Sequence, residues 1–191
     1  MKSALLVVDV QNDFCPGGSL AVAEGDQIIP IINRLLPRFE TVVYTRDWHP
    51  AAHISFAVQP RFVDQSWPVH CVAGTPGAAF HPALQVREDA IIVNKGTAVD
   101  QEAYSGFQGT DLADQLRRLG VATLYLTGLA TDYCVKATAL DARREGFQVR
   151  VIRDAVRGVD VPPGSAAQAL RELEGAGVKL ISAAEYEDGV S

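Results

Sequence analysis

A cysteine stands in the middle of the stretch TGLATDYCVKATALDARREG, at Cys134, where the pattern predicts the first turn of a helix. A thiol reacts mainly as the thiolate, and the unpaired N–H groups and positive dipole end of a helix N-terminus lower a thiol pKa. The same N–H groups could hold an oxyanion during acyl transfer. Free cysteine is also a common small core residue, so its position alone leaves nucleophile and core packing as equal alternatives.

Two charged residues directly follow buried apolar runs elsewhere in the chain. Asp9 follows the run ALLVV, and Lys95 follows AIIVN. Taken singly, a turn-capping aspartate and a surface lysine are the ordinary interpretations. Beside a thiol, Asp9 could act as general base and then as proton donor, while Lys95 orients it and favours the thiolate. The three residues together favour Cys134 as a nucleophile.

All four histidines fall in one segment of the chain, together with an aspartate. Asp47 and His49 lie two apart in an extended stretch, followed by His53 and His70. Carboxylate and imidazole ligands suit catalytic zinc, iron(II) or manganese sites. A hydrogen-bonded loop network without metal is the alternative. His81, in FHPAL, is expected to cap a turn or pack.

The elements that must position these residues alternate along the chain. Apolar runs predict strands at 4–8, 41–45, 90–93, 122–128, 148–152 and 178–181, and amphipathic runs predict helices at 25–39, 109–120, 131–146 and 162–177. This alternation predicts an α/β fold, a doubly wound, Rossmann-like open sheet of about six mostly parallel strands with helices on both faces. Ligands bind beyond the carboxyl ends of such strands, where the acid, the amine, the thiol and the Asp/His group should meet.

Residues 48–89 break this alternation, because they contain no clear helix or strand. A loop of that length is uncommon in a compact domain and is usually functional or disordered. Its own apolar anchors, including Trp67, argue against disorder. We therefore expect a long metal-binding loop after the second strand.

Length and composition narrow the class of protein. A chain of 191 residues predicts a single domain, residues 1–191. The net charge of -6 argues against nucleic-acid binding, and the apolar runs are too short to cross a membrane. The N-terminal apolar run stops at Asp9 without a signal-peptide cleavage site, which favours a cytoplasmic protein. Cys15 and Cys71 are read as structural, since three cysteines fit reduced thiols.

Five segments, in this order, resemble the nicotinamidases of the isochorismatase-like cysteine hydrolase superfamily: VDVQNDFCPGGSLAV, DWHPAAH, WPVHCVAGTPGA, NKGTAVDQEAYSGF and GLATDYCVKATALDA. The resemblance runs from about residue 5 to residue 160. It implies an isochorismatase-like hydrolase fold and an amidase that converts nicotinamide and water to nicotinate and ammonia. It also implies a catalytic triad of Cys134, Asp9 and Lys95.

The resemblance further implies one divalent metal ion beside the triad, with zinc favoured and iron or manganese as alternatives. The matching ligands are Asp47, His49 and His70, and His53 matches a ligand position in some members. In related enzymes the metal binds the pyridine nitrogen of the substrate.

The pocket and the oxyanion hole are also implied by the resemblance. Family structures carry a cis peptide at the position of Leu129–Ala130, and the N–H groups of Ala130 and Cys134 would face the oxyanion. Leu129 is expected in the substrate pocket as well. Aromatic positions that flank a flat ring are matched by Phe14, Trp67 and Tyr104, for which core packing is the alternative.

The implied mechanism is covalent: Asp9 takes the proton of Cys134, the thiolate attacks the carboxamide, ammonia leaves, and water hydrolyses the thioester. Related enzymes often accept pyrazinamide, and a homo-oligomer is left open. Three other functions remain as alternatives: an amidase for a different small amide, a hydrolase in which metal-bound water attacks while Cys134 only packs, and a non-enzymatic metal or thiol sensor.

Overall fold

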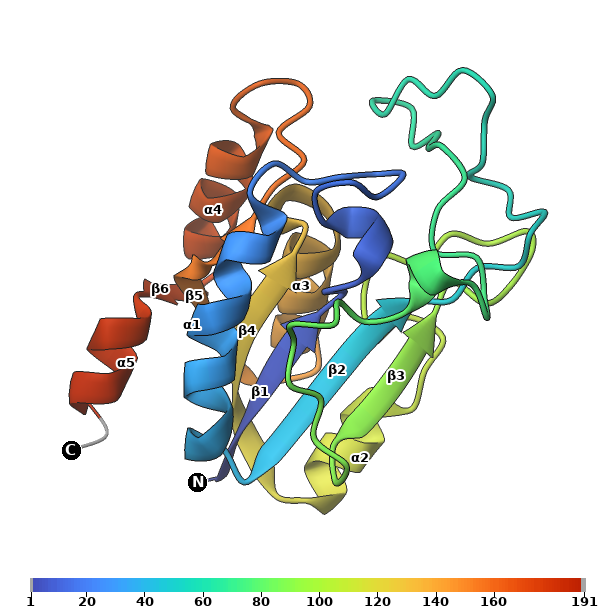
Figure 1. The fold of residues 1–191 in the computed structure, drawn as a ribbon. Helices are drawn as coiled ribbons and strands as arrows, with labels where there is room; N and C mark the ends of the chain where they lie inside the picture. Colours follow the sequence, from blue (N-terminus) through green and yellow to red (C-terminus); the bar gives the residue numbers. More distant parts are fainter. Residues whose placement is uncertain (1, 190–191) are drawn as a thin grey trace.

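A single open sheet of six strands forms the centre of the computed structural model, which describes residues 2–189 (Figure 1). The strands are β1 (Lys2–Val8), β2 (Thr41–Asp47), β3 (Ile91–Lys95), β4 (Val121–Leu129), β5 (Gln148–Arg157) and β6 (Lys179–Ile181). Their order in the sheet is β3-β2-β1-β4-β5-β6, and every pairing between them is parallel. The expected open parallel sheet is confirmed.

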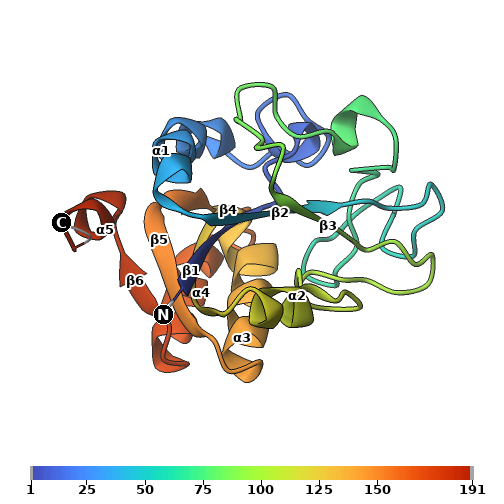
Figure 2. The ribbon, with the colours of Figure 1, turned by 90° about the horizontal axis from the view of Figure 1, so that it is seen from below.

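Helices cover both faces of this sheet, as a doubly wound fold requires (Figure 2). They are α1 (Ile29–Leu35), α2 (Leu112–Arg118), α3 (Lys136–Arg144), α4 (Ser165–Gly175) and α5 (Ala183–Gly189). Side chains alternate along β1, so Leu5 and Val7 pack with α1 and α5, whereas Leu6 and Val8 pack with α2, α3 and α4. The two apolar clusters therefore pack against opposite faces of the sheet.

Several elements differ from the expected boundaries. The helix expected at 25–39 is the shorter α1, flanked by 3₁₀ turns at Gly25–Ile28 and Leu36–Arg38. Pro30 lies in the first turn of α1, and Pro37, which lacks an N–H, lies where the α-helix stops. Strand β5 continues to Arg157, beyond its apolar run, and the C-terminal α5 was not predicted.

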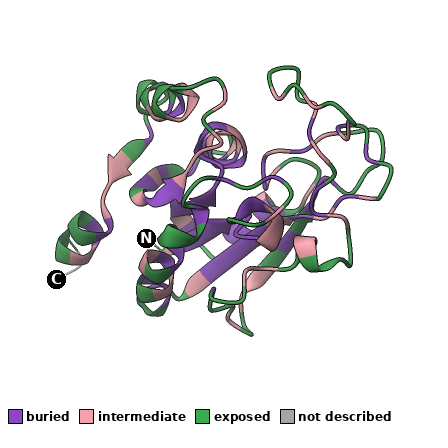
Figure 3. Ribbon diagram, turned by 45° about the horizontal axis from the view of Figure 1, so that its top comes forward, coloured by how far each residue is buried: buried purple, intermediate pink, exposed green. Residues whose placement is uncertain are grey.

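The long loop between β2 and β3 extends beyond the carboxyl end of the sheet (Figure 1). Backbone hydrogen bonds hold it in place: the N–H of His49 donates to the C=O of Cys71, and that of Trp67 donates to Ser55. A short 3₁₀ turn at Pro76–Ala78 packs against the segment that follows β1. Buried residues concentrate in the sheet and its inner faces, while the outer part of this loop is exposed (Figure 3).

None of the helices between residues 2 and 189 combines the length and the apolarity needed to cross a lipid bilayer. All three cysteines are buried free thiols, as the sequence predicted.

Candidate active site and metal centre

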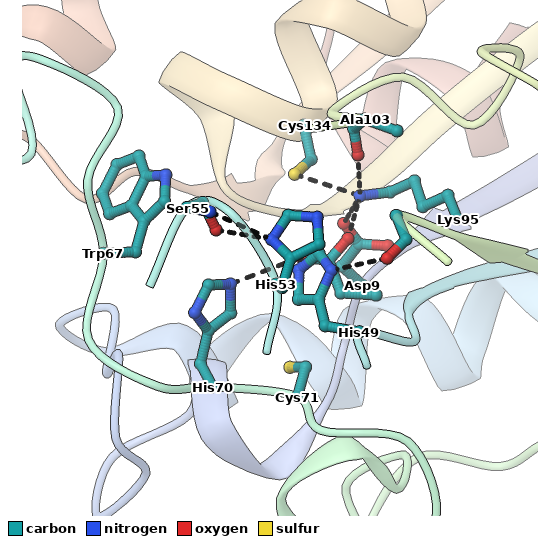
Figure 4. Close-up of polar contacts among 12 residues, drawn as sticks. Asp9, His49, His53, Ser55, Trp67, His70, Cys71, Lys95, Ala103 and Cys134 are labelled. Carbon is teal, nitrogen blue, oxygen red and sulfur yellow. Dashed lines mark hydrogen bonds and ion pairs between the residues drawn. The ribbon is translucent and has the colours of Figure 1, made fainter. Parts of the chain in front are cut away.

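Three strand ends bring an acid, an amine and a thiol together in the interior (Figure 4). Asp9 follows β1, Lys95 ends β3, and Cys134 lies in a π-helical turn, Thr131–Val135, that joins β4 to α3. The Lys95 Nζ atom is 2.8 Å from Asp9 Oδ2 and 3.4 Å from Cys134 Sγ. All three side chains are almost inaccessible to solvent. The predicted convergence of these residues is therefore observed in the structure.

Two contacts from β2 fix the carboxylate of Asp9 and leave one oxygen available. The Asp9 N–H donates to the C=O of Thr45 at 3.1 Å, and the Thr45 hydroxyl donates to Asp9 Oδ1 at 2.6 Å. Among the described residues, Oδ2 accepts no well-aligned hydrogen bond, although it lies beside the Lys95 ammonium. A carboxylate oxygen of Asp9 and Cys134 Sγ lie within 4.8 Å of each other. Oδ2 can therefore accept the proton of the thiol.

The resting state of Cys134 differs from the sequence expectation. Burial raises the pKa of this thiol well above its ordinary value, and it outweighs the opposing effect of Lys95. Burial also raises the pKa of Asp9, again against the effect of Lys95. The lowered thiol pKa expected from a helix N-terminus is therefore not found. Cys134 rests as a neutral thiol beside a carboxylate of increased basicity, which suits proton transfer at the moment of attack.

The amine of Lys95 stays charged despite its burial. Burial alone would lower its pKa, but the carboxylates of Asp47 and Asp9 raise it well above the ordinary lysine value. The ammonium also donates to the C=O of Ala103 at 3.3 Å. Lys95 is therefore a buried cation that balances the negative charges of Asp9 and Asp47 beside Cys134.

Three expected metal ligands form a second buried cluster next to this group. Asp47, His49 and His70 each offer one ligand atom, all within 4.8 Å of one another. The Nε2 atoms of His49 and His70 are 3.4 and 3.7 Å from Asp47 Oδ2. Both Nδ1 atoms are 2.8 Å from backbone carbonyl groups, those of Gly96 and Pro68. A carbonyl only accepts, so each Nδ1 carries a proton, and in the neutral imidazole the lone pair then lies on Nε2.

This donor set fits a divalent cation. The buried Nε2 of His49 has no hydrogen-bond partner within residues 2–189, and it faces a carboxylate oxygen that is also an acceptor. Two acceptors that face each other in a buried site are stabilised by a cation between them. Orientation of metal-binding histidines through a backbone carbonyl on the other ring nitrogen is a usual feature of such sites.

The structure places His53 beside this cluster, with both ring nitrogens engaged in the loop. Its Nδ1 is 2.8 Å from the Ser55 hydroxyl, and its Nε2 is 3.1 Å from the C=O of Gln101. It forms a neighbouring group with His49 and Glu102, not with His70. The expectation that His53 is a ligand is therefore weakened, because its own hydrogen bonds use both nitrogens.

Gln11, which the sequence did not single out, holds the backbone of Asp47. Its buried amide donates to the C=O of Asp47 at 2.8 Å and to that of Ala78 at 2.9 Å. The Asp47 N–H donates back to Gln11 Oε1 at 2.8 Å. Gln11 could have been recognised from VDVQNDF, because its polar residues directly follow a buried strand.

A narrow pocket of about 20 Å³ leads to Cys134. Its walls are Phe14, Leu20, Asp47, Trp67, His70, Glu102, Tyr104, Ala130, Tyr133, Cys134 and Val159. The predicted aromatic positions are thus present. Trp67 donates its indole N–H to the Tyr104 hydroxyl at 3.0 Å, and its ring meets that of Tyr133 edge-on. These contacts place flat apolar surfaces around the thiol.

Leu129 is not part of the pocket wall, which corrects the sequence expectation. It is the last residue of β4, and its side chain is fully buried in the core on the α1 face of the sheet. Ala130, one residue later, lines the pocket instead. Both residues belong to the same apolar cluster, and Ala130 lies at its edge beside Cys134. The Leu129–Ala130 peptide bond is cis, as the resemblance implied.

Sequence analysis missed four pocket residues: Leu20, Glu102, Tyr133 and Val159. Glu102 is notable, because its Oε2 is buried and has no hydrogen-bond partner among the described residues. Its position in QEAYSGF, close to Tyr104, was the available signal. Val159 had none, since it comes from the loop after β5.

The carboxylate of Asp132, in the turn that carries Cys134, binds the loop after β5. It accepts the N–H groups of Val159 at 3.0 Å and Asp160 at 2.9 Å, and the hydroxyl of Ser165 at 2.7 Å. Ala130 occupies the cap position of the π-helical turn. Asp132 therefore joins the turn that carries Cys134 to the pocket wall.

Comparison with known proteins agrees with this arrangement. The nicotinamidase of Escherichia coli (strain K12) is 43% identical over 206 residues, which cover 97% of either chain. The pyrazinamidase of Pyrococcus horikoshii, solved in complex with zinc, shares 49% identity with a TM-score of 0.87, over 95% of this chain and 99% of that one. PnC1 from L. infantum, solved in complex with nicotinate, shares 35% identity with a TM-score of 0.86, over 96% and 93%.

The model of the isochorismatase domain matches residues 3–185. That span includes the whole sheet except Lys2, the first residue of β1, and it includes every residue of the proposed triad and of the Asp47, His49 and His70 cluster. The chain therefore belongs to the isochorismatase family.

Proposed function

We propose that this protein is a nicotinamidase, which hydrolyses nicotinamide to nicotinate and ammonia, and that residues 1–191 act as one catalytic domain. The observation that carries the proposal is the contact of one buried ammonium, that of Lys95, with both Asp9 and Cys134 beside an aromatic-lined pocket. Near full-length similarity to a nicotinamidase supports the choice of substrate.

The first half-reaction forms a thioester. Asp9 Oδ2 takes the proton from Cys134 Sγ as the sulfur attacks the carboxamide carbon. The backbone N–H groups of Ala130 and Cys134 hold the oxyanion, which is the role expected of preorganised donors. Asp9 then returns the proton to the nitrogen, the C–N bond breaks, and ammonia leaves. Lys95 remains an ammonium throughout and stabilises the charge that moves between Asp9 and the sulfur.

The second half-reaction uses the same groups in the reverse direction. Asp9 takes a proton from water as the water oxygen attacks the thioester carbon. The C–S bond breaks, nicotinate is released, and the proton returns to Cys134 Sγ. The oxygen and one proton of water enter the carboxyl group, and the other proton replaces the thiol proton that left with ammonia, so the enzyme regains its resting thiol.

Asp47, His49 and His70 would hold one divalent metal ion. Zinc is our first choice because two imidazoles and a carboxylate are typical of catalytic zinc sites, and iron or manganese would use the same ligands. When bound, the ion would supply a Lewis acid for the ring nitrogen of the substrate. His70 lines the same pocket as Cys134, so a ring bound near the metal would place its carboxamide toward the sulfur.

The aromatic walls would bind the flat ring and exclude water. A pocket of about 20 Å³ holds roughly one water molecule. Binding of a heteroaromatic amide therefore requires the side chains of Trp67, Tyr104 and their neighbours to move apart. Pyrazinamide has the same flat shape and a ring nitrogen in the same place, and we propose that it is also a substrate.

The three free thiols suit the reducing cytoplasm, where we place the enzyme.

Ammonia release from a panel of aromatic and aliphatic amides tests this function. Nicotinamide and pyrazinamide should be hydrolysed, and small aliphatic amides should not. A preference for a different small amide would favour another amidase activity on the same fold. Without ammonia from any amide, the enzyme proposal fails and a metal or thiol sensor gains support.

Cys134→Ala separates covalent catalysis from attack by metal-bound water. The covalent mechanism predicts near-complete loss of ammonia release, whereas the water mechanism predicts nearly normal turnover. Cys15→Ala is the matched control, since it removes a buried thiol that lies outside the pocket.

A further inference from the structure

We propose that Asp13 is a positioning residue for the metal centre: its carboxylate fixes the peptide group between His70 and Cys71 and, through Cys71, the backbone of His49. The inference rests on the proposed function only in taking Asp47, His49 and His70 as the metal ligands. Asp13 lies in the segment after β1, outside the pocket wall, and it would act through Cys71 without contact with substrate.

The carboxylate of Asp13 bridges two loops. Its Oδ2 accepts the N–H of Cys71 at 2.7 Å, and its Oδ1 lies 3.4 Å from the N–H of Ser19. The C=O of Asp13 accepts the N–H of Leu20 at 3.0 Å, which anchors Asp13 itself. A hydrogen bond to a carboxylate is roughly twice as strong as one between neutral groups. The contact with Cys71 is therefore suited to hold a backbone position.

The backbone that Asp13 holds is one that needs support. Cys71 has φ 46°, in the left-handed region that residues other than glycine rarely adopt. Its N–H is bound by Asp13, and its C=O accepts the N–H of His49 at 3.0 Å. The C=O of His49 in turn accepts the N–H of Ala73 at 2.8 Å. Rotation of the Cys71 backbone would shift His70, its direct neighbour, and release His49.

The glycine at position 77 leaves room for the Asp13 carboxylate. A Cβ atom added at Gly77 would overlap the carboxylate group of Asp13. The φ of Gly77 is outside the left-handed region, so a glycine is needed there for close approach and not for backbone conformation. The next residue after Asp13, Phe14, packs its ring 5.5 Å from that of His70. Asp13 and Phe14 thus contact the same part of the metal loop from one side.

Gln11 makes the matching contact to the other ligand. Gln11 binds the N–H and the C=O of Asp47. Asp13, two residues later in the chain, binds the N–H of Cys71, which follows His70. The polar side chains of Gln11 and Asp13 thus hold the two ends of the ligand set, which the sequence separates by more than twenty residues.

The test measures metal affinity without turnover, by competition of zinc between the purified protein and a chromophoric chelator. Loss of a residue that supports metal ligands typically weakens binding 10–100-fold, so Asp13→Ala should weaken zinc binding by about tenfold or more. Asp13→Asn keeps an oxygen acceptor for Cys71 but loses the negative charge, so it should weaken zinc binding less than Asp13→Ala does. Asp100→Ala, a charge removal at an exposed site, is the control and should bind zinc like the parent.

Gly77→Ala provides an independent perturbation that leaves every charge in place. By displacing the Asp13 carboxylate, it should weaken zinc binding as Asp13→Ala does. In the Asp13→Ala background the three atoms nearest to the added methyl group are gone, so Gly77→Ala should then have less effect than in the parent. Such non-additivity is expected of two residues that act through one contact. The visible spectrum of the cobalt-substituted protein should change in Asp13→Ala and not in Asp13→Asn.

A merely structural role would give a different result. If Asp13→Ala lowers the melting temperature but leaves zinc affinity and the cobalt spectrum unchanged, the inference is wrong. If Asp13→Ala does not fold, Gly77→Ala decides, and an unchanged zinc affinity in that variant also overturns the inference. A parent protein that binds no metal overturns it as well. A parent that binds zinc but releases no ammonia from nicotinamide contradicts only the proposed function, because zinc affinity is measured separately.

Discussion

The ammonium group of Lys95 is paired with the carboxylate of Asp47 as well as with that of Asp9. Asp47 uses its two oxygens differently: Oδ1 faces Lys95, and Oδ2 faces the Nε2 atoms of His49 and His70. One buried cation therefore joins the proposed triad to the proposed metal centre. The charge balance of both groups depends on it.

Lys95→Met should destabilise the protein by about 3–5 kcal/mol, because it leaves two buried carboxylates without their cation. Urea denaturation at pH 7 with a chelator present measures this loss. In a double variant with Asp9→Asn one of those charges is absent, so part of the stability should return. Lys136→Met is the control: its partner Glu172, 3.0 Å away, is partly exposed, and the loss should stay below about 1 kcal/mol. Equal losses in the two lysine variants would contradict the prediction.

Asp9→Asn should lower kcat for ammonia release by about 10²–10⁴, the usual contribution of a general base. The asparagine oxygen can still accept the hydroxyl of Thr45, so the fold and KM should change little. Steady-state kinetics and thermal unfolding measure the two effects. Asp26→Asn, at an exposed position, serves as the control. A variant that keeps kcat within a few-fold would rule out Asp9 as the base.

Chelation should raise KM for nicotinamide without unfolding the protein, and added zinc should restore the original value. Circular dichroism and metal analysis accompany the kinetics. Asp47→Ala and His70→Ala should lose the metal, whereas His53→Ala should retain it, because the ring of His53 is engaged by Ser55 and Gln101. Unchanged KM after verified metal removal would count against the proposed ligands.

Cys15 should be almost inert toward iodoacetamide in the folded protein. Burial, with a smaller contribution from Asp26, raises its pKa from 9.0 to about 11. A raised pKa favours the protonated thiol, so at pH 8 the reactive thiolate should be roughly 100-fold scarcer than in the unfolded chain. Below pH 9.5 the labelling rate should rise about tenfold per pH unit, as expected for a thiol still below its pKa. Peptide mass spectrometry, with and without denaturant, measures this; equal rates in both conditions would exclude the shift.

Local sequence pattern was sufficient for the architecture and for the main chemical groups. Apolar runs such as residues 4–8 are typical of strands buried in a parallel sheet, and polar residues after such strands fall at one edge of the sheet. For that reason the sequence alone predicts that Asp9, Lys95 and Cys134 lie close together. Element ends do not follow from the pattern in the same way, since β5 continues past its apolar run and α5 was not predicted.

The amino-acid sequence by itself determined the fold class, the residues available for catalysis and the order in which the strands deliver them. Tertiary packing decided which of these residues share a cavity and in what charge state. Ala130 lines the pocket while its neighbour Leu129 does not, and the carboxylate of Asp132 binds a loop that is distant in the sequence. The thiol pKa of Cys134 rises because burial outweighs an adjacent cation. Burial and the balance of nearby charges arise only when segments far apart in the chain come into contact, so no local pattern encodes them.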